Sequence, residues 1–170
     1  MTVLRATTDG VVTIRPPQPG DGELLIAGRD EEFRRFLGAG DPDPQPLGCI
    51  VVAGEVVGWV DHDRDRSWLE PGEVNVGYAL FPAARGRGIG KRAVRLLIHH
   101  LAVDTDATVA TFLIDPANER SQRLAQRVGA VRVADLDGNP YFKLTVTPMA
   151  AAEPAHDEAL AHVVDVPRRR

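Results

Sequence analysis

The stretch RGRGIGKRAVRLL, residues 85–97, places three glycines within five residues, crowds them with positive charge and runs directly into a helical pattern. The backbone amides at a helix N-terminus lack partners within the helix, and the helix dipole favours an anion at this end. Glycine has no Cβ, so it lets the backbone approach a ligand closely. The stretch therefore predicts a phosphate-binding loop at the start of a helix.

The segments on either side of this loop predict a crossover unit. VNVGYALF (74–81) is typical of a strand and is ended by Pro82, the helix continues to about Ala102, and ATVATFLI (107–114) is typical of a central strand. A strand, a helix and a second strand in this order form a right-handed unit with parallel strands. Because anions bind at the carboxyl ends of such strands, we expect the loop at a ligand-binding edge of the sheet.

The remaining patterns complete one mixed sheet. They predict a strand at 11–15, a helix at 22–38 that can split near Gly28, two strands within 49–63 around Ala53-Gly54-Glu55, a helix that begins at Asn118 and ends before Gly129, and a hairpin of 130–135 and 141–147 around Asp137-Gly138. This order predicts one α/β domain at residues 11–147, with a mixed sheet of about six to seven strands flanked by helices. Residues 148–170 are rich in Ala, Pro and charge, and they predict a tail with a short helix at 155–164 as an option.

Composition and charge exclude several classes of protein. The chain has 170 residues, of which 44% are hydrophobic and 26% charged, with a net charge of −4. It contains no apolar run near the roughly 18–20 residues of a membrane span and no secretory pattern, and its charge does not suit bulk nucleic-acid binding. Cys49 is the single cysteine, which excludes an internal disulfide and a multi-cysteine metal site. We therefore expect a cytoplasmic protein without a membrane, nucleic-acid or metal partner.

Two familiar phosphate-binding patterns do not fit the glycine-rich loop. The loop of nucleoside triphosphatases requires GxxxxGK[ST], but Arg85 stands where the first glycine belongs and Arg92 where Ser or Thr belongs. The dinucleotide pattern GxGxxG fits at Gly86 and Gly88 and then fails at Lys91, and no early βαβ unit surrounds it.

A third pattern, [RQ]xxGx[GA], fits at Arg85, Gly88 and Gly90. It closely resembles the pyrophosphate loop of the GNAT superfamily of acyl-CoA-dependent N-acetyltransferases. The segment NERSQRLAQRVGAV that begins at Asn118 resembles the later helix of that family, and the order of elements agrees over residues 11–147. Ser121 follows that asparagine by three residues, and a small residue, Ala125, stands at the tyrosine position of the family. This pattern is similar to that of the branch that includes ribosomal-protein N-terminal acetyltransferases.

The resemblance implies how acetyl-CoA binds. The amides of residues 86–91 would hold the pyrophosphate, with added charge from three basic side chains, and the strand before the loop would pair with the pantetheine arm through its backbone. An asparagine would contact the arm from the other side, although Asn is also a good helix N-cap in any protein. The residues assigned to CoA in this way are Tyr78, Ala79, Leu80, Arg85, Gly86, Arg87, Gly88, Ile89, Gly90, Lys91 and Asn118.

The resemblance also suggests a general base on the strand before the loop. Glu73 is the first candidate, and Asn75 would line the site as a polar contact on the same face of the strand. Asp61, His62 and Asp63 are other candidates, because they lie near a strand end that could face the substrate cleft and because a base can act through one bridging water. The alternative interpretation of each of these acids, and the favoured one for any single acid, is a solvated hairpin end.

The general acid is where the sequence departs from the family. Many members place a Tyr seven residues after the asparagine to protonate the departing thiolate, and this chain has Ala125 there. Either no side chain serves as the acid, or Ser121, Tyr78 or Tyr141 replaces the missing tyrosine.

The sequence thus predicts an N-acetyltransferase that moves the acetyl group of acetyl-CoA directly to a primary amine of a small molecule or a peptide N-terminus. The alternative is a CoA-binding sensor or a catalytically silent domain of the same fold; a different acyl donor and a dinucleotide-binding domain also stay open. The helix at 22–38, with Asp30, Glu31 and Glu32, and the loops at 39–48 and 61–73 are rich in acids, which suit a cationic amine or only keep the exposed loops hydrated. A homodimer formed through a sheet edge or the final strands is a further expectation.

Overall fold

The computed structural model describes residues 3–149, so the predicted tail helix at 155–164 lies outside the described residues. The strands are β1 (Thr7–Thr8), β2 (Val12–Arg15), β3 (Gly48–Val52), β4 (Glu55–Asp63), β5 (Glu73–Leu80), β6 (Val109–Leu113), β7 (Val131–Leu136) and β8 (Asn139–Thr145). The helices are α1 (Asp21–Ala27), α2 (Glu31–Leu37), α3 (Ile89–Asp104) and α4 (Glu119–Arg127), with a single 3₁₀ turn, η1 (Pro82–Ala84). Within residues 3–149, no helix is both long and apolar enough to cross a membrane.

The described strands form one mixed sheet in the order β1-β2-β3-β4-β5-β6-β8-β7. Its neighbours are antiparallel except for β5 and β6, which are parallel and are joined through α3. The mixed α/β fold is therefore as predicted. The sheet has eight strands rather than six to seven, because the lead-in segment contributes the two-residue strand β1 through its pairing with β2.

Two tight turns form as the sequence predicts. Ala53 and Gly54 have φ angles of 51° and 82°, and Asp137 and Gly138 have φ angles of 50° and 81°. Positive φ at both central residues matches the right-handed twist of the strands that such a turn connects. These turns fix the pairing of β3 with β4 and of β7 with β8.

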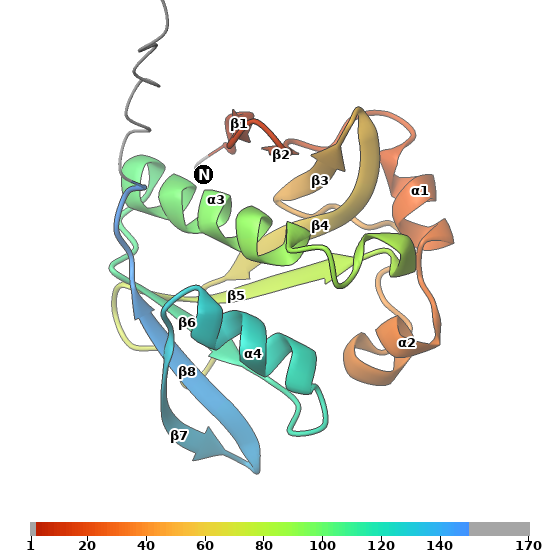
Figure 1. Ribbon diagram of the computed structural model, residues 1–170. Coiled ribbons are helices and arrows are strands. Elements are labelled where there is room, and N and C mark those ends of the chain that lie inside the picture. Colours follow the sequence, from red (N-terminus) through yellow and green to blue (C-terminus); the bar gives the residue numbers. More distant parts are fainter. Residues whose placement is uncertain (1–2, 150–170) are drawn as a thin grey trace, which may run out of the picture.

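The main hydrophobic core lies between the sheet and α3. Ala93, Leu97 and Leu101 of this helix are fully buried and belong to one cluster with Val60 and Val74 of the sheet. Figure 1 shows α3 and α4 side by side in front of the sheet, with α1 and α2 beyond one end of β5. The core therefore anchors the helix that the glycine-rich loop begins.

The predicted 22–38 helix is split into α1 and α2. A Cβ on Gly28 would lie 2.3 Å from the Phe81 ring, so a side chain at this position cannot be accommodated. Asp30 then caps the new helix by accepting a hydrogen bond from the Phe33 N–H. The split thus lets the chain after β5 pack into the α1–α2 junction.

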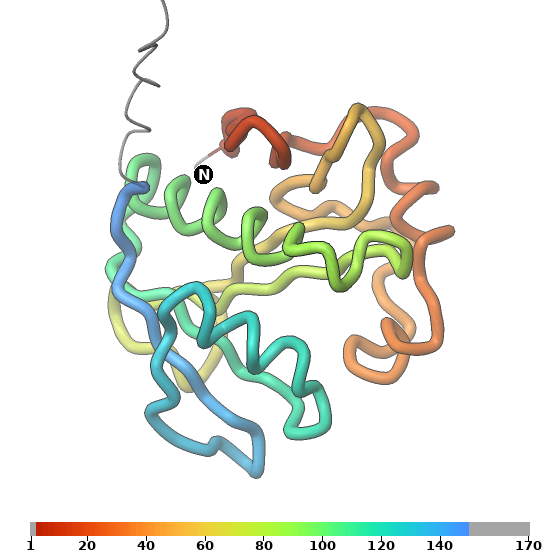
Figure 2. The backbone as a smooth tube through the Cα atoms, in the orientation of Figure 1, coloured from red at the N-terminus to blue at the C-terminus, as the bar shows by residue number. Residues whose placement is uncertain are grey.

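Strands β5 and β6 pair over a short length and then part, as the diverging chain traces in Figure 2 show. Their pairing covers Glu73–Asn75 against Val109–Thr111. From residue 76 onward β5 keeps its antiparallel partner β4 on one side, up to Leu80. The other edge of β5 therefore faces an opening between the strands, directly before the glycine-rich loop.

Candidate active site

The opening between β5 and β6 is a groove with a cavity volume of about 160 Å³. It is lined by residues 76–80 of β5, by 112–115 after the parting of the strands, by α2 and by the start of α4. The backbone N–H and C=O groups of successive residues in a strand point alternately to the two neighbouring strands. The Phe81 N–H bonds to β4, at Val57, whereas the Val74 carbonyl accepts from Thr111 of β6. By this alternation the backbone groups of Tyr78 and Leu80 face the groove.

The glycine-rich loop turns sharply into α3. Gly86 and Gly88 have φ angles of 71° and 75°, and a Cβ on either would meet no atom within 4 Å. These two glycines therefore serve the backbone conformation rather than close packing. The first hydrogen bond of the helix runs from the Arg92 N–H to the Gly88 carbonyl, so the amides of residues 89–91 have no intrahelical acceptor.

Gly90 has a different role from the other two glycines. It is buried, and a Cβ there would lie 2.8 Å from Leu124 of α4 and 3.6 Å from the Tyr78 ring. Gly90 thus lets α3, α4 and β5 approach one another around the groove. Arg87 is exposed and Lys91 half-buried, and neither forms an ion pair with any residue in the described range 3–149.

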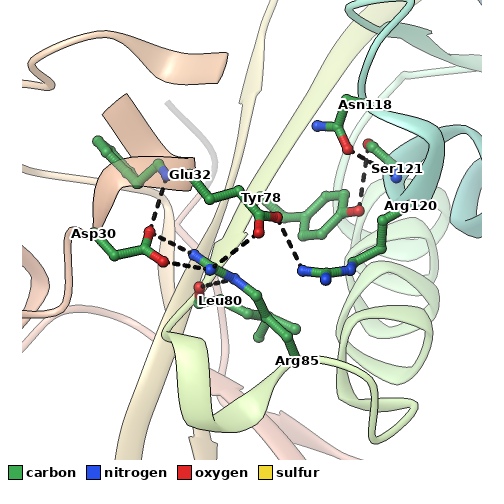
Figure 3. A network of polar contacts seen from close by, with 9 residues as sticks. Asp30, Glu32, Tyr78, Leu80, Arg85, Asn118, Arg120 and Ser121 are labelled. Atoms are coloured by element: carbon green, nitrogen blue, oxygen red, sulfur yellow. Dashed lines mark hydrogen bonds and ion pairs between the residues drawn. The ribbon is translucent and has the colours of Figure 1, made fainter. Parts of the chain in front are cut away.

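Arg85 does not direct its guanidinium along the loop. It turns toward α2, where Nη1 and Nη2 bond the two Asp30 oxygens at 2.6 and 2.9 Å and Nη1 lies 3.4 Å from Glu32 (Figure 3). Its Nε also donates to the Leu80 carbonyl at 3.1 Å. Because the Arg85 hydrogen bond stabilises its charged form, the Asp30 carboxyl has a pKa well below its ordinary value. This side chain fastens the first turn of α2 to the end of β5.

A second ion pair crosses the mouth of the groove. Glu32 of α2 accepts a hydrogen bond of 2.9 Å from Arg120 of α4 (Figure 3). Both side chains are partly exposed, at 38% and 52% of their surface, so this pair is weaker than the Arg85 contacts. Together with Arg85 it links α2, the end of β5 and α4 around the groove.

Three predicted residues meet on the α4 side of the groove. The Asn118 side chain accepts a hydrogen bond from the Ser121 N–H and so caps α4, while both residues line the groove. The Tyr78 hydroxyl donates to Ser121 Oγ at 3.3 Å. Burial raises the pKa of Tyr78 above its ordinary value, so the phenol is protonated and able to donate. Ala125, at the position where many family members have a tyrosine, is fully buried.

Glu73 and Asn75 are the predicted general base and polar contact, and the structure places them away from the groove. Neither lines the groove, because both lie at the start of β5, where β6 still pairs with it. Glu73 is buried in an ion pair with Lys143 of β8. Burial acts to raise its pKa, but the hydrogen bonds from Lys143 and from the Glu70 N–H outweigh burial and hold the pKa below its ordinary value. A carboxylate in this state is a poor general base.

The structure separates the other candidates. Asp63 pairs with Arg66, and Tyr141 points its hydroxyl at the Glu73 carboxylate, 3.5 Å away. His62 is half-buried, and burial lowers its pKa. Asp61 faces a second cavity, described below.

Cys49 is part of the structural core rather than of the site. The side chain is fully buried, and burial together with the nearby Asp21 carboxylate raises the pKa of the thiol to about 12. A thiol in this state carries almost no reactive thiolate.

The family follows from comparison with known proteins. A model of the acetyltransferase (GNAT) domain matches residues 12–131. The chain belongs to the GNAT acetyltransferase family. This GNAT protein is accordingly an acetyl-CoA-dependent acetyltransferase, as its sequence predicts. A comparison with curated protein sequences finds no significant match.

Solved structures share the fold of this GNAT chain. An aminoglycoside acetyltransferase, AAC(6')-Ib in complex with coenzyme A, is 21% identical, with 79% of this chain and 94% of that chain covered and a TM-score of 0.66. RimJ of Mycobacterium smegmatis, in complex with CoA-disulfide, is 16% identical, with 85% and 87% covered and a TM-score of 0.66. A Vibrio cholerae protein provisionally named a ribosomal-protein-serine acetyltransferase is 18% identical, with 85% and 99% covered and a TM-score of 0.65. The predicted family branch is therefore represented among the structural neighbours.

Sequence reasoning missed the partners of Arg85. Asp30 and Glu32 stand 55 and 53 residues before it, and Arg120 joins them from α4. The available signal was the acidic start of α2, but Asp and Glu are common at any helix N-terminus and so do not point to Arg85.

Proposed function

We propose that this chain binds acetyl-CoA in the groove and transfers the acetyl group directly to a primary amine of a small molecule or a peptide N-terminus. The observation that carries this proposal is the edge of β5 at Tyr78 and Leu80, which pairs with no described strand, although Arg85 Nε donates to the Leu80 carbonyl. This edge leads into amides without intrahelical acceptors at the start of α3. An extended pantetheine arm can pair with such an edge as an added strand does. The pyrophosphate can then meet the helix N-terminus.

Two charged side chains are available to the phosphates. Arg87 and Lys91 flank the amides of the loop and carry no counter-ion within residues 3–149. The Arg85 guanidinium, by contrast, already donates hydrogen bonds to Asp30 and to the Leu80 carbonyl, so Arg85 contacts the phosphates mainly through its backbone. Asn118 borders the groove opposite β5, where a side-chain amide can contact the arm.

The reaction needs one nucleophile, one electrophile and three proton movements. The acceptor ammonium loses a proton, its nitrogen forms a bond to the acetyl carbonyl carbon, and the carbon–sulfur bond then breaks with the electron pair leaving on sulfur. The nitrogen loses a second proton, the CoA thiolate takes up one, and one proton is released overall. Groove-facing N–H groups of β5 can stabilise the oxyanion, and Ser121, hydrogen-bonded to Tyr78, is the proposed source of the thiolate's proton.

Calorimetric titration with acetyl-CoA tests the binding half of this proposal. Gly88→Glu should abolish binding through steric block and charge repulsion while the fold survives. Gly54→Glu is the matched control, because Gly54 also has a positive φ, of 82°, and open space, but lies in the β3–β4 turn. NADP should not bind to either protein.

The outcomes separate the proposal from its alternatives. Saturable acetyl-CoA binding that Gly88→Glu alone removes, together with thiol release in the presence of an amine, supports the transferase. Binding without turnover on any amine supports a silent CoA-binding domain, which the alanine at position 125 would fit. Equal affinity in Gly88→Glu and the parent protein contradicts the assignment of the loop.

A further inference from the structure

A second cavity, of about 270 Å³, is bounded by α2, the loop that follows it and β4. Its floor is formed by Trp59 and Asp61 of β4, which alternate with the core residue Val60 and so point to the sheet face away from α3. Phe33 and Leu37 of α2 line this cavity and the groove alike. The two spaces therefore share a wall.

The floor of this cavity has a short path to the edge of β5. Asp61 is paired in register with Gly77, and Trp59 with Ala79. Side chains of such partners lie on the same face of a sheet, but Gly77 has none and Ala79 has only a methyl group. A Cβ on Gly77 would contact the Trp59 ring at 3.6 Å, so the indole already lies against this strand. Because neighbouring strands lie about 4.8 Å apart, only β5 separates Asp61 from the groove; its own side chains at Gly77 and Ala79 are small, and the Trp59 indole is the bulky group beside this crossing.

The chemistry of the cavity favours a cation on an apolar body. Phe33 and Leu37 of α2 form an apolar wall, and Pro44 and Pro46 of the following loop extend it. The indole face of Trp59 can attract a cation. Burial and the neighbouring Asp63 charge raise the pKa of Asp61, and hydrogen bonds from backbone N–H groups offset this only in part. A cationic partner would therefore stabilise this carboxylate.

The other charged groups of the cavity do not cancel this preference. Arg29 lines the cavity, but its guanidinium donates to the carbonyls of Ala39 and Asp41 and lies over the Phe33 ring at 5.3 Å. It thus holds the loop against α2 rather than pairing with Asp61. The Asp41 side chain adds a second carboxylate to the lining. Small-molecule sites usually have volumes of about 300–1,000 Å³, so this cavity suits a small ligand better than a peptide chain.

Resting on the proposed function, we infer that this second cavity is the acceptor site and that it selects a small primary amine with an apolar body and no carboxylate beside the amino group. Asp61 holds the ammonium, and Trp59 supports the body. Asp61 thus receives the ammonium as it enters; once the amine has lost its proton, the neutral nitrogen leaves Asp61 and crosses β5 beside Gly77 to reach the thioester in the groove.

A matched pair of amines tests this inference. Thiol release from acetyl-CoA is followed with 2-phenylethylamine, with phenylalanine, which adds only an α-carboxylate, and with a short peptide that has a free N-terminal alanine. The variant is Asp61→Asn, which keeps the size of the side chain and its acceptor oxygen. Asp43→Asn is the control, because it removes the same charge from an exposed loop position that does not line the cavity.

The parent protein should use 2-phenylethylamine with a kcat/KM about 10-fold or more above that for phenylalanine or the peptide. Asp61→Asn should lower this kcat/KM by about 10- to 100-fold, the loss of one hydrogen bond between charged groups, and leave the Kd of acetyl-CoA unchanged. Asp43→Asn should stay within about twofold of the parent. An unchanged kcat/KM in Asp61→Asn, an equal effect of both substitutions, or a preference for phenylalanine or the peptide overturns the inference. Any of these results with intact acetyl-CoA binding leaves the proposed function standing, whereas loss of acetyl-CoA binding in the parent protein refutes the proposed function itself.

Discussion

Replacing Arg85 by methionine tests whether this residue acts on the fold rather than on CoA. Methionine keeps much of the apolar stem and removes the guanidinium. The substitution breaks two bonds to Asp30, at 2.6 and 2.9 Å, one contact to Glu32 and one bond to the Leu80 carbonyl. It therefore releases the first turn of α2 from the end of β5.

The size of the effect follows from burial. The Arg85 and Asp30 side chains are 14% and 31% exposed, so this pair is partly shielded from water, whereas Glu32, at 38%, adds little. A hydrogen bond to a charged group contributes about 1.5–3 kcal/mol, and the exposure of Asp30 reduces the sum. We expect Arg85→Met to lower the free energy of unfolding by about 2–3 kcal/mol, which corresponds to a fall in Tm of roughly 4–12 °C.

Urea unfolding at several pH values is the assay. Arg85 lowers the native pKa of Asp30, so the stability that the pair contributes is full above the ordinary pKa of an aspartate and is lost as pH falls through the lower native value. The difference between the parent protein and the variant should stay constant above about pH 5 and shrink below about pH 4. Arg87→Met is the control: it should change stability by no more than about 0.5 kcal/mol but weaken acetyl-CoA binding. Equal stability of Arg85→Met and the parent protein, or a larger loss of acetyl-CoA affinity in Arg85→Met than in Arg87→Met, would refute this reasoning.

Three further predictions concern the acid, the helix junction and pH. Ser121→Ala should lower kcat for acetyl transfer by about 100-fold in stopped-flow thiol release without changing the Kd of acetyl-CoA, and an unchanged kcat would remove this serine as the acid. Gly28→Ala should lower the free energy of unfolding by about 1–3 kcal/mol, because its Cβ would lie 2.3 Å from the Phe81 ring. Gly22→Ala is the control and should not lower it, because a Cβ at Gly22 meets open space. Equal stability of the two variants would contradict the packing argument. Burial lowers the pKa of His62 in the native state, so stability should fall as pH drops below about 6.5, and His62→Gln should flatten this fall in a pH series of urea melts; an unchanged slope would exclude His62 as its source.

Local signals in the sequence were enough for most of the fold. The turns at Ala53-Gly54 and Asp137-Gly138, the helix start at the glycine-rich loop and the cap at Asn118 each depend on residues close together in the chain. Strand β1 was not predicted, because two threonines carry no pattern and form a strand only through their register with β2. Long-range pairing of this kind leaves no trace in a short window.

The site was predictable only where it is made of backbone. The loop amides and the edge of β5 follow from the position of the loop in the crossover unit, whereas side-chain partners come from distant elements. Lys143 lies 70 residues after Glu73 and turns a candidate base into half of a partly buried ion pair. Asp30 similarly diverts Arg85 from the phosphate loop, and neither contact is encoded by spacing.

Amide hydrogen exchange with and without saturating acetyl-CoA tests the central claim most directly. The N–H groups of Gly77 and Ala79 point to β4 and should be protected in both states, whereas those of Tyr78 and Leu80 should gain protection only when acetyl-CoA pairs with the strand edge. The amides of residues 89–91 should gain protection together with them. Saturable binding that leaves Tyr78 and Leu80 unprotected would show that the cofactor does not lie along β5 and would contradict the account.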